Sequence, residues 1–254
     1  LLRIEEDKRG TQLILSRAHK NFVDSLFKSE VPEINEGIVE IMGISRDPGG
    51  RTKIAVSSAD SDIDAVGACV GMRGSRVQNI IQELKGEKID IVPWSPDPAR
   101  FSCNALSPAR VNKVILDESS KIMEVIVDED QYSLCIGRRG QNVRLASELT
   151  QWEITVKTDI QLKEEQQSVV KLLLTLPNIS EVNANLLFAG GYHTLEDIAF
   201  GEIDSISKSS GITNEEDINK IQLAARNALK DRLRNIEVDD NEDDFEEDSE
   251  EKLS

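Results

Sequence analysis

The sequence contains only three cysteines, Cys69, Cys103 and Cys135, among its 254 residues. No two of them form a C-x-x-C pair, and an odd, widely spaced set is neither a disulfide framework nor a zinc site. The only histidines, His19 and His193, stand apart from any serine or cysteine arrangement that nucleophilic catalysis would need. The sequence therefore predicts a protein of a reducing compartment, the cytoplasm, with no metal site, no cofactor and no catalytic residues.

Long apolar runs are also missing. No stretch approaches the roughly 20 apolar residues of a membrane span, and no signal peptide is visible. Aromatic residues make up 4% and hydrophobic residues 39% of the chain, which suits several small mixed domains better than one large core. Because the sequence opens on Leu1 and not on methionine, we expect it to be a fragment.

Negative charge dominates the total but is unevenly distributed. The formal net charge is −17, and residues 237–254, with eleven acids against one lysine, hold −10 of it. Such a block is expected to be disordered and solvated, although it could instead compete with a nucleic acid for a binding surface or contact a basic partner. The remaining residues carry only −7, so the acidic total does not exclude nucleic-acid binding by the folded part of the chain.

One phrase of the sequence occurs twice. The stretch GACVGMRGSRVQNI, residues 67–80, returns as SLCIGRRGQNVRLA, residues 133–146. In both places the pattern predicts a short helix before the glycines, a longer helix after them, two strands upstream and one strand downstream. The repeat is longer than those of solenoid proteins, so it predicts two tandem domains. The proline-rich joint between them, PWSPDPAR, favours a fixed mutual orientation.

The two G-x-x-G loops, Gly71–Gly74 and Gly137–Gly140, each precede an expected helix. The unpaired backbone N–H groups and positive dipole end of a helix N-terminus favour phosphate. Glycine permits close backbone approach and positive φ, and arginine between the glycines adds a forked phosphate donor. A plain turn does not need arginine twice, so the loops predict a grip on a sugar–phosphate backbone.

The repeated units resemble KH domains, in which a G-x-x-G loop clamps about four nucleotides of single-stranded RNA. The expected order, helix–strand–strand–helix–helix–strand, is that of the bacterial, type II, variant. The stretches SRDPGGRTKIAVSS, NALSPARV and CIGRRGQNVRLASELTQWEI further resemble the KH region of the NusA family of bacterial transcription elongation factors. The resemblance covers roughly residues 12–157 and is weaker over 159–235.

This resemblance implies a function. It implies an RNA-binding elongation factor that acts with RNA polymerase and other transcription factors, and that modulates pausing, termination and antitermination through nascent single-stranded RNA. It also implies an OB-fold domain upstream, of which residues 1–17 would be a remnant. Because Met72 stands where the second loop has Arg138, we expect the first loop to contribute less electrostatic affinity. The implied RNA contacts are Gly71, Met72, Arg73, Gly74, Ser75 and Arg76 in the first module, and Gly137, Arg138, Arg139, Gly140, Gln141, Asn142 and Arg144 in the second.

Two other repeated features have structural interpretations. Cys69 and Cys135 occupy matching positions before the loops, and we interpret both as small buried packing residues, not as redox groups. A pair of acids begins the short helix of each module, and helix capping explains these acids better than metal binding does. The pairs are Asp62 with Asp64 and Asp128 with Asp130.

Beyond the repeat the chain becomes helical. The stretch FAGGYHTLEDI, residues 188–198, resembles a helix-hairpin-helix, a motif often used on DNA backbones. Residues 159–235, however, hold twelve acids against eight Lys and Arg, whereas a DNA clamp should be basic. We therefore favour a protein-contacting or packing role for this region.

Together these patterns predict an α+β protein, a monomer, with two tandem type II KH domains. Two alternatives remain open. An enzyme that docks RNA through KH modules would need a metal or nucleophile cluster, which the sequence lacks. A protein-interaction scaffold would depend on the acidic helical C-terminal region, with RNA binding secondary. The expected domains are an OB-fold remnant at 1–17, KH domains at 18–95 and 96–158, a helix-hairpin-helix-like domain at 159–236 and a disordered acidic tail at 237–254.

Overall fold

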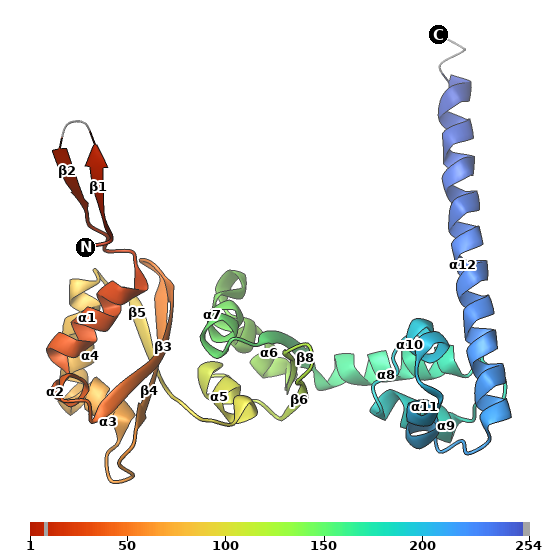
Figure 1. Cartoon of the computed structure of the whole chain (residues 1–254), viewed down its shortest axis with the longest axis horizontal. Helices are drawn as coiled ribbons and strands as arrows, with labels where there is room; N and C mark the ends of the chain where they lie inside the picture. The colour runs from red at the N-terminus through yellow and green to blue at the C-terminus, as the bar shows by residue number, and fades with distance from the viewer. Residues whose placement is uncertain (8–9, 251–254) are drawn as a thin grey trace. The chain divides into compact units, whose positions relative to one another are not determined.

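A computed structural model of the chain describes residues 1–7 and 10–250, with no account of the side chains of residues 7, 233 and 235–250. The described chain divides into two compact units, Leu1–Asp159 and Ile160–Ser254. The first unit holds the duplicated modules, and the second is helical (Figure 1).

The first module is a three-stranded sheet with helices on one face. Its strand order is β3-β4-β5, in which β3 and β4 are antiparallel and β4 and β5 are parallel. Val23 and Phe27 from α1 pack with Ile54 and Ile80 in the core between the helices and the sheet. The elements are α1 (Lys20–Glu30), α2 (Pro32–Asn35), β3 (Val39–Asp47), β4 (Arg51–Ser58), α3 (Ala65–Val70), a 3₁₀ turn (Met72–Gly74), α4 (Ser75–Glu83) and β5 (Lys88–Pro93).

The second module repeats this arrangement. Its sheet has the order β6-β7-β8, again with one antiparallel and one parallel pair. The predicted α+β class and the type II element order are thus confirmed. The elements are α5 (Pro98–Ala105), β6 (Lys113–Asp117), β7 (Ile122–Val127), α6 (Glu129–Ile136), a 3₁₀ turn (Arg138–Gly140), α7 (Gln141–Thr150) and β8 (Glu153–Thr158).

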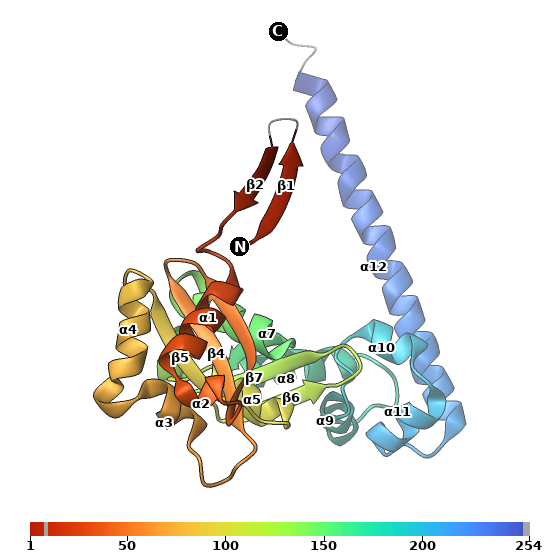
Figure 2. The same ribbon diagram turned by 60° about the vertical axis from the view of Figure 1, so that its left-hand side comes forward.

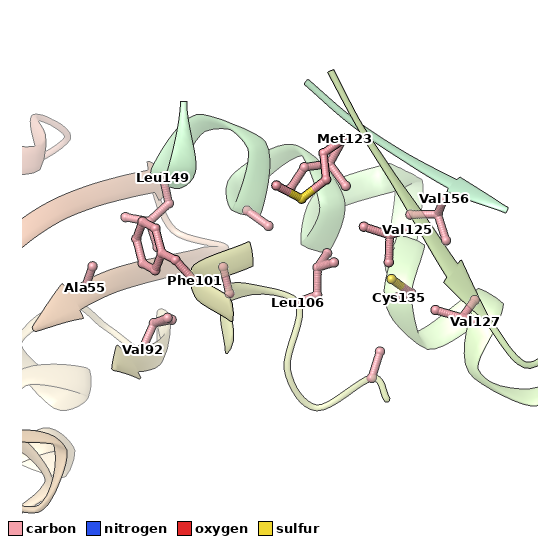
Figure 3. Packing of buried hydrophobic residues seen from close by; sticks show 14 residues of the cluster. Ala55, Val92, Phe101, Leu106, Met123, Val125, Val127, Cys135, Leu149 and Val156 are labelled. Atoms are coloured by element: carbon pink, nitrogen blue, oxygen red, sulfur yellow. The ribbon is translucent and has the colours of Figure 1, made fainter. Parts of the chain in front are cut away.

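The two modules share a core. Strand β4 is buried along most of its length, because α1 and α4 cover one face of the first sheet and the second module covers the other (Figures 1 and 2). Ala55 and Val92 of the first module therefore lie in one apolar cluster with Phe101 and Leu149 of the second (Figure 3). A strand buried on both faces reads as a continuous apolar run, as residues 54–56 of β4 do.

Helix α7 lies along strand β3, and this contact fixes the second module on the first. The hydroxyl of Ser45 donates a buried hydrogen bond to the backbone oxygen of Leu145 at 2.7 Å. A Cβ on Gly43 would lie 3.3 Å from Cδ1 of Leu149, so the missing side chain lets the helix approach closely. Residues 43 and 45 share one face of the strand, and residues 145 and 149 share one face of the helix.

An N-terminal hairpin precedes the modules. It consists of β1 (Arg3–Asp7) and β2 (Gly10–Ile14), paired antiparallel. Arg46 of β3 donates to the backbone oxygens of Arg17 and His19, which ties the start of α1 to the first sheet. The origin of this hairpin in an OB-fold domain stays a prediction.

The second unit begins in α8 (Asp159–Leu173) and contains the expected helix, glycine turn and helix. Ser180 and Thr194 form capping boxes at the starts of two successive helices, and Gly190 and Gly191 make the turn between them. Leu187 packs in the core of this unit with other apolar residues of the same helices. These helices are α9 (Glu181–Ala189), α10 (Leu195–Phe200), α11 (Ile203–Ser210) and α12 (Glu215–Glu250).

The backbone of α12 continues as helix to Glu250, whereas the sequence predicts a disordered tail from residue 237. Residues 251–254 of that tail lie outside the described residues. A run of like charges weakens an isolated helix, because acids three and four positions apart repel one another. Disorder of the tail in solution therefore stays a prediction.

Candidate nucleic-acid interface

The two G-x-x-G loops have the same backbone conformation. The first glycine has φ and ψ of 73° and 175° at Gly71 and of 74° and 174° at Gly137. The third residue, Arg73 or Arg139, is left-handed in both loops, with φ of 53° and 52°. Two stretches that share only the glycines and one arginine inside the loop fold alike, so the turn is specified by the motif itself.

The first glycine of each loop is required by packing. A Cβ on Gly71 would lie 2.7 Å from Cγ of Arg76, and a Cβ on Gly137 would lie 2.8 Å from Cβ of Asn142. Real side chains do not approach so closely. The first glycine therefore lets the loop fold back on the first turn of the helix that follows it.

The second glycine of each loop, Gly74 or Gly140, faces open space. A Cβ on either would meet no heavy atom within 4 Å, and both residues have positive φ. They precede the first residues of α4 and α7. The N–H groups of Gly74 and Ser75 donate to the backbone oxygens of Gly71 and Met72, and those of Gly140 and Gln141 donate in the same way to Gly137 and Arg138. An anion could still approach the positive end of each helix here without meeting a side chain of the second glycine.

The side chains between the glycines point outward. Arg73, Arg138 and Arg139 are exposed and have no hydrogen-bond or ion-pair partner among the described residues. Met72 is 88% exposed, which is unusual for a large apolar side chain. Ser75, at the start of α4, is also exposed. The predicted site residues at the tips of the loops are thus available to a ligand.

Arg76 is turned inward. Its Nη1 donates to Oε2 of Glu33 at 2.8 Å and to the backbone oxygen of Ala68 at 2.6 Å. The guanidinium thereby ties α4 to the end of α3 and to α2. The structure gives Arg76 an internal role and offers no support for the predicted RNA contact.

Asn142 occupies the matching position in the second module and is also turned inward. It is 4% exposed, and its Nδ2 donates to the backbone oxygens of Leu106 and Cys135 at 3.1 Å and 3.0 Å. It joins the loop to α6 in the same way that Arg76 joins the first loop to α3. Its prediction as an RNA contact is likewise unsupported, because the side chain is not accessible.

Gln141 and Arg144 remain near the surface, but their side chains donate hydrogen bonds to a residue of the first module. Asp47, at the end of β3, accepts hydrogen bonds from Nε2 of Gln141 at 2.6 Å and from Nη2 of Arg144 at 3.4 Å. Both donors lie on the first turn of α7, directly after the second loop. The two modules thus meet at the second loop.

A cleft of about 540 Å³ lies at this meeting point, large enough for a small polar ligand. The first module contributes Arg51 and Lys88, and the second contributes Arg138. Lys88 and Arg138 are exposed and have no partner among the described residues, whereas Arg51 donates two hydrogen bonds to Asp90. These bonds raise the pKa of Arg51, so it stays charged. The complete lining is Gly50, Arg51, Lys88, Pro108, Ser133, Leu134, Gly137, Arg138, Gln141 and Asn142.

Comparison with known families agrees with this geometry. Residues 17–94 match the family model of the NusA-like first KH domain, and residues 98–164 match that of the NusA-like second KH domain. This chain carries the tandem KH region of the NusA family.

Two curated relatives are similar along most of the chain. The transcription termination/antitermination protein NusA of Rickettsia prowazekii (strain Madrid E) is 43% identical over 219 residues, or 84% of this chain. NusA of Rickettsia conorii (strain ATCC VR-613 / Malish 7) is 44% identical over the same share. The chain spans 44% of the length of each of these relatives.

A solved structure, titled "Crystal structure of APE1850", is 22% identical and covers 54% of this chain and 96% of its own. Its TM-score is 0.41, so the similarity is too low to support an inference about this chain. Across the part of the chain that the structure describes, no helix combines the length and apolar character needed to cross a membrane.

The cysteines of this NusA region are packing residues, as the sequence predicts. Cys69 and Cys135 are fully buried at matching positions, and Cys103 is partly buried. Burial raises the pKa of the Cys69 and Cys135 thiols to about 11, so both are protonated at neutral pH. A protonated, buried thiol is a poor nucleophile, which leaves these residues without redox chemistry.

The capping interpretation of the acid pairs is only partly confirmed. Asp64 caps α3 by accepting from the backbone N–H of Val66 at 3.1 Å. Asp128 occupies the N-cap position of α6, but its carboxylate makes no capping hydrogen bond and accepts from Nδ2 of Asn112 at 2.8 Å. Asp130 lies in the first turn of α6, where it suits the helix dipole. Among the described residues, no group of three or more His, Cys, Asp or Glu could hold a metal ion.

Sequence reasoning missed Asp47 and Lys88 of this NusA interface. Asp47 stands before the turn PGG, and Lys88 is the first residue of the strand that closes the first module, so each is typical of a solvated strand end. Both acquire a place in the site because the second module docks on the first sheet. No local pattern in either module carries that information.

Proposed function

We propose that this chain binds single-stranded RNA by gripping the sugar–phosphate backbone with its two G-x-x-G loops. The observation that carries the proposal is the identical backbone of the two loops, each with exposed groups at the start of a helix. Both loops belong to modules that share one core, so their mutual orientation is fixed. This arrangement suits two clamps acting on one extended strand.

The chemistry of the site favours a polyanion. The positive dipole ends of α4 and α7 favour phosphate, and Arg73, Arg138 and Arg139 supply charge-assisted donors to its oxygens. Lys88 of the first module adds a cation to the lining of the cleft beside the second loop. The first loop offers one arginine and the second offers two, so the second loop contributes more of the electrostatic affinity.

The biological role extends this binding to transcription. The two Rickettsia relatives are named transcription termination/antitermination proteins. We propose that this chain serves the same process in the cytoplasm, as a monomer without catalytic activity, by holding nascent RNA near RNA polymerase and other transcription factors. Pausing, termination and antitermination would then depend on how firmly the two loops hold the transcript.

A second candidate function rests on the helical unit. Val182, Leu186 and Phe200 are 68%, 45% and 75% exposed, although they belong to helices that otherwise bury their apolar residues. Exposed apolar side chains on an acidic surface favour a protein contact over a nucleic-acid contact. In this alternative the chain is a protein-interaction scaffold, and RNA binding is secondary.

The test uses the open positions in the loops. Gly74 and Gly140 can be replaced together by Asp or, as the matched neutral control, by Asn, because both residues tolerate positive φ better than most. Affinity for a short unstructured oligoadenylate is measured by fluorescence anisotropy across a salt series. We expect the Asp variant to bind at least about tenfold more weakly with a flatter salt slope, and the Asn variant to keep most of the affinity.

Circular dichroism and urea unfolding check that both variants remain folded. If the Asp and Asn variants bind RNA as tightly as the unmodified protein, the loops are only turns. The scaffold function would then take first place.

A further inference from the structure

Asp47 is an acid in the middle of a candidate RNA-binding surface. Its carboxylate lies at the end of β3 and reaches across to the first turn of α7. There it accepts from Gln141 at 2.6 Å and from Arg144 at 3.4 Å, the two polar side chains on the first turn of α7 that are not buried. A carboxylate held by an amide and a guanidinium presents the same oxygens to the same donors as a phosphate would.

The turn after β3 is shaped to let this contact form. A Cβ on Gly50 would lie 2.9 Å from Nε2 of Gln141 and 3.2 Å from the carboxylate of Asp47. Gly50 has no positive φ, so its conformation does not demand glycine. The missing side chain therefore serves the close approach of Gln141 to Asp47.

Docking of the modules does not depend on this contact. The buried hydrogen bond from Ser45 to the backbone of Leu145 and the packing of Leu149 already hold α7 against β3. The side chains of Asp47 and Arg144 are 38% and 56% exposed, and an exposed ion pair contributes little to stability. The carboxylate can therefore be displaced without separating the modules.

We propose that Asp47 competes with RNA phosphate for Gln141 and Arg144 at the second loop. This inference rests on the proposed function. When RNA enters the second loop, its phosphate must replace the carboxylate of Asp47 as the acceptor for Gln141 and Arg144. Binding at this loop is therefore weaker than it would be without Asp47. Weak, exchangeable binding suits a protein that must let a transcript move through its grip.

The competition is confined to the second module. Ser75 and Gln78 stand at the positions of the first module that match Gln141 and Arg144, and neither carries a charge. The first loop thus has fewer cations and no internal competitor. The second loop has more cations, but Asp47 competes with RNA for two of its donors.

The experiment compares Asp47→Ala with Glu148→Ala, which removes the same charge from an exposed position on α7. Affinity for the oligoadenylate is measured by anisotropy across a salt series, and urea unfolding checks each fold. We expect Asp47→Ala to bind about three- to tenfold more tightly than Glu148→Ala. Its salt slope should be steeper by about 0.7, the value of one further phosphate contact on a single strand.

A double variant isolates the contact. If Asp47 competes through Arg144, the gain from Asp47→Ala disappears when Arg144 is also replaced by Gln. Equal affinities for Asp47→Ala and Glu148→Ala would overturn the competition. Weaker binding by Asp47→Ala would also overturn it, because Asp47 would then be positioning the loop.

The two proposals fail in different ways. If the unmodified protein does not bind the oligoadenylate, or binds it regardless of the loop glycines, the proposed function is wrong. If it binds through the loops and Asp47→Ala behaves as Glu148→Ala does, only the competition is wrong.

Discussion

At the scale of single residues, the two glycines of each loop have different tasks, and substitution separates them. Gly137→Ala places a Cβ at 2.8 Å from Cβ of Asn142, whereas Gly140→Ala places one in open space. Both variants also adopt a positive φ. We expect Gly140→Ala to lower the free energy of unfolding by about 1 kcal/mol and Gly137→Ala by about 2–3 kcal/mol. Urea unfolding measures both, and equal losses would mean that the contact with Asn142 is not restrictive.

A buried ion pair makes the stability of the first module depend on pH. Arg46 donates to both carboxylate oxygens of Glu87 at 2.9 Å, and Thr52 and the backbone of Gly49 donate to them as well. Burial alone would raise the pKa of Glu87, but these hydrogen bonds outweigh it, and the pKa lies below its usual value of 4.5. Glu87 therefore stabilises the fold in its charged form.

Glu87→Gln should lower the free energy of unfolding by about 3 kcal/mol at pH 7, because Arg46 is left buried without its counter-charge. A lowered pKa gives stability that is complete above the unfolded value and is lost as the pH falls through the folded value. The difference between the two proteins should therefore be constant above pH 4.5 and shrink below it. Urea unfolding at several pH values measures this, and a difference that persists unchanged at pH 3 would contradict the assignment.

At the scale of helices and strands, the duplication supplies matched substitutions. Leu149 of α7 packs in the core shared by the modules, whereas Leu84, which follows α4, packs only inside the first module. We expect Leu149→Ala and Leu84→Ala each to lower the free energy of unfolding by about 2–4 kcal/mol. Only Leu149→Ala should loosen the joint between the modules, seen as faster proteolysis within residues 93–97. Equal cleavage of the two variants would mean that α7 does not hold the modules together.

The same elements show which parts of the fold and of the site can be predicted from the sequence. Alternating and helical periodicities are local, so the strands, the helices and the repeated loops could be predicted from each module alone. The docking of α7 on β3 could not, because Gly43 and Ser45 look like ordinary residues of an exposed strand. The expectation that Arg76 and Asn142 face RNA comes from the family resemblance alone. They turn inward because the end of the preceding helix in each module presents a carbonyl oxygen that only the folded module brings near.

At the scale of the whole molecule, the proposed function depends on two loops carried by one compact unit, Leu1–Asp159. Once one loop holds an RNA strand, the other loop meets the same strand at a high effective concentration, provided that the strand is long enough to reach it. We therefore expect affinity for oligoadenylates of increasing length to rise by a step, of about tenfold or more, at the length that spans both loops. A protein with independent sites would show only a gradual increase with the number of binding registers.

Three variants test the origin of that step. Gly74→Asp or Gly140→Asp alone should remove the step. Each single variant should still bind the shortest RNA, through the loop that is unchanged. The remaining affinity should be lower when the second loop is the one disabled, because Met72 stands in the first loop where the second has Arg138. Leu149→Ala should reduce the step without changing affinity for the shortest RNA, since it loosens the joint and leaves both loops intact. A step that survives Gly140→Asp would show that the second loop is not the second clamp.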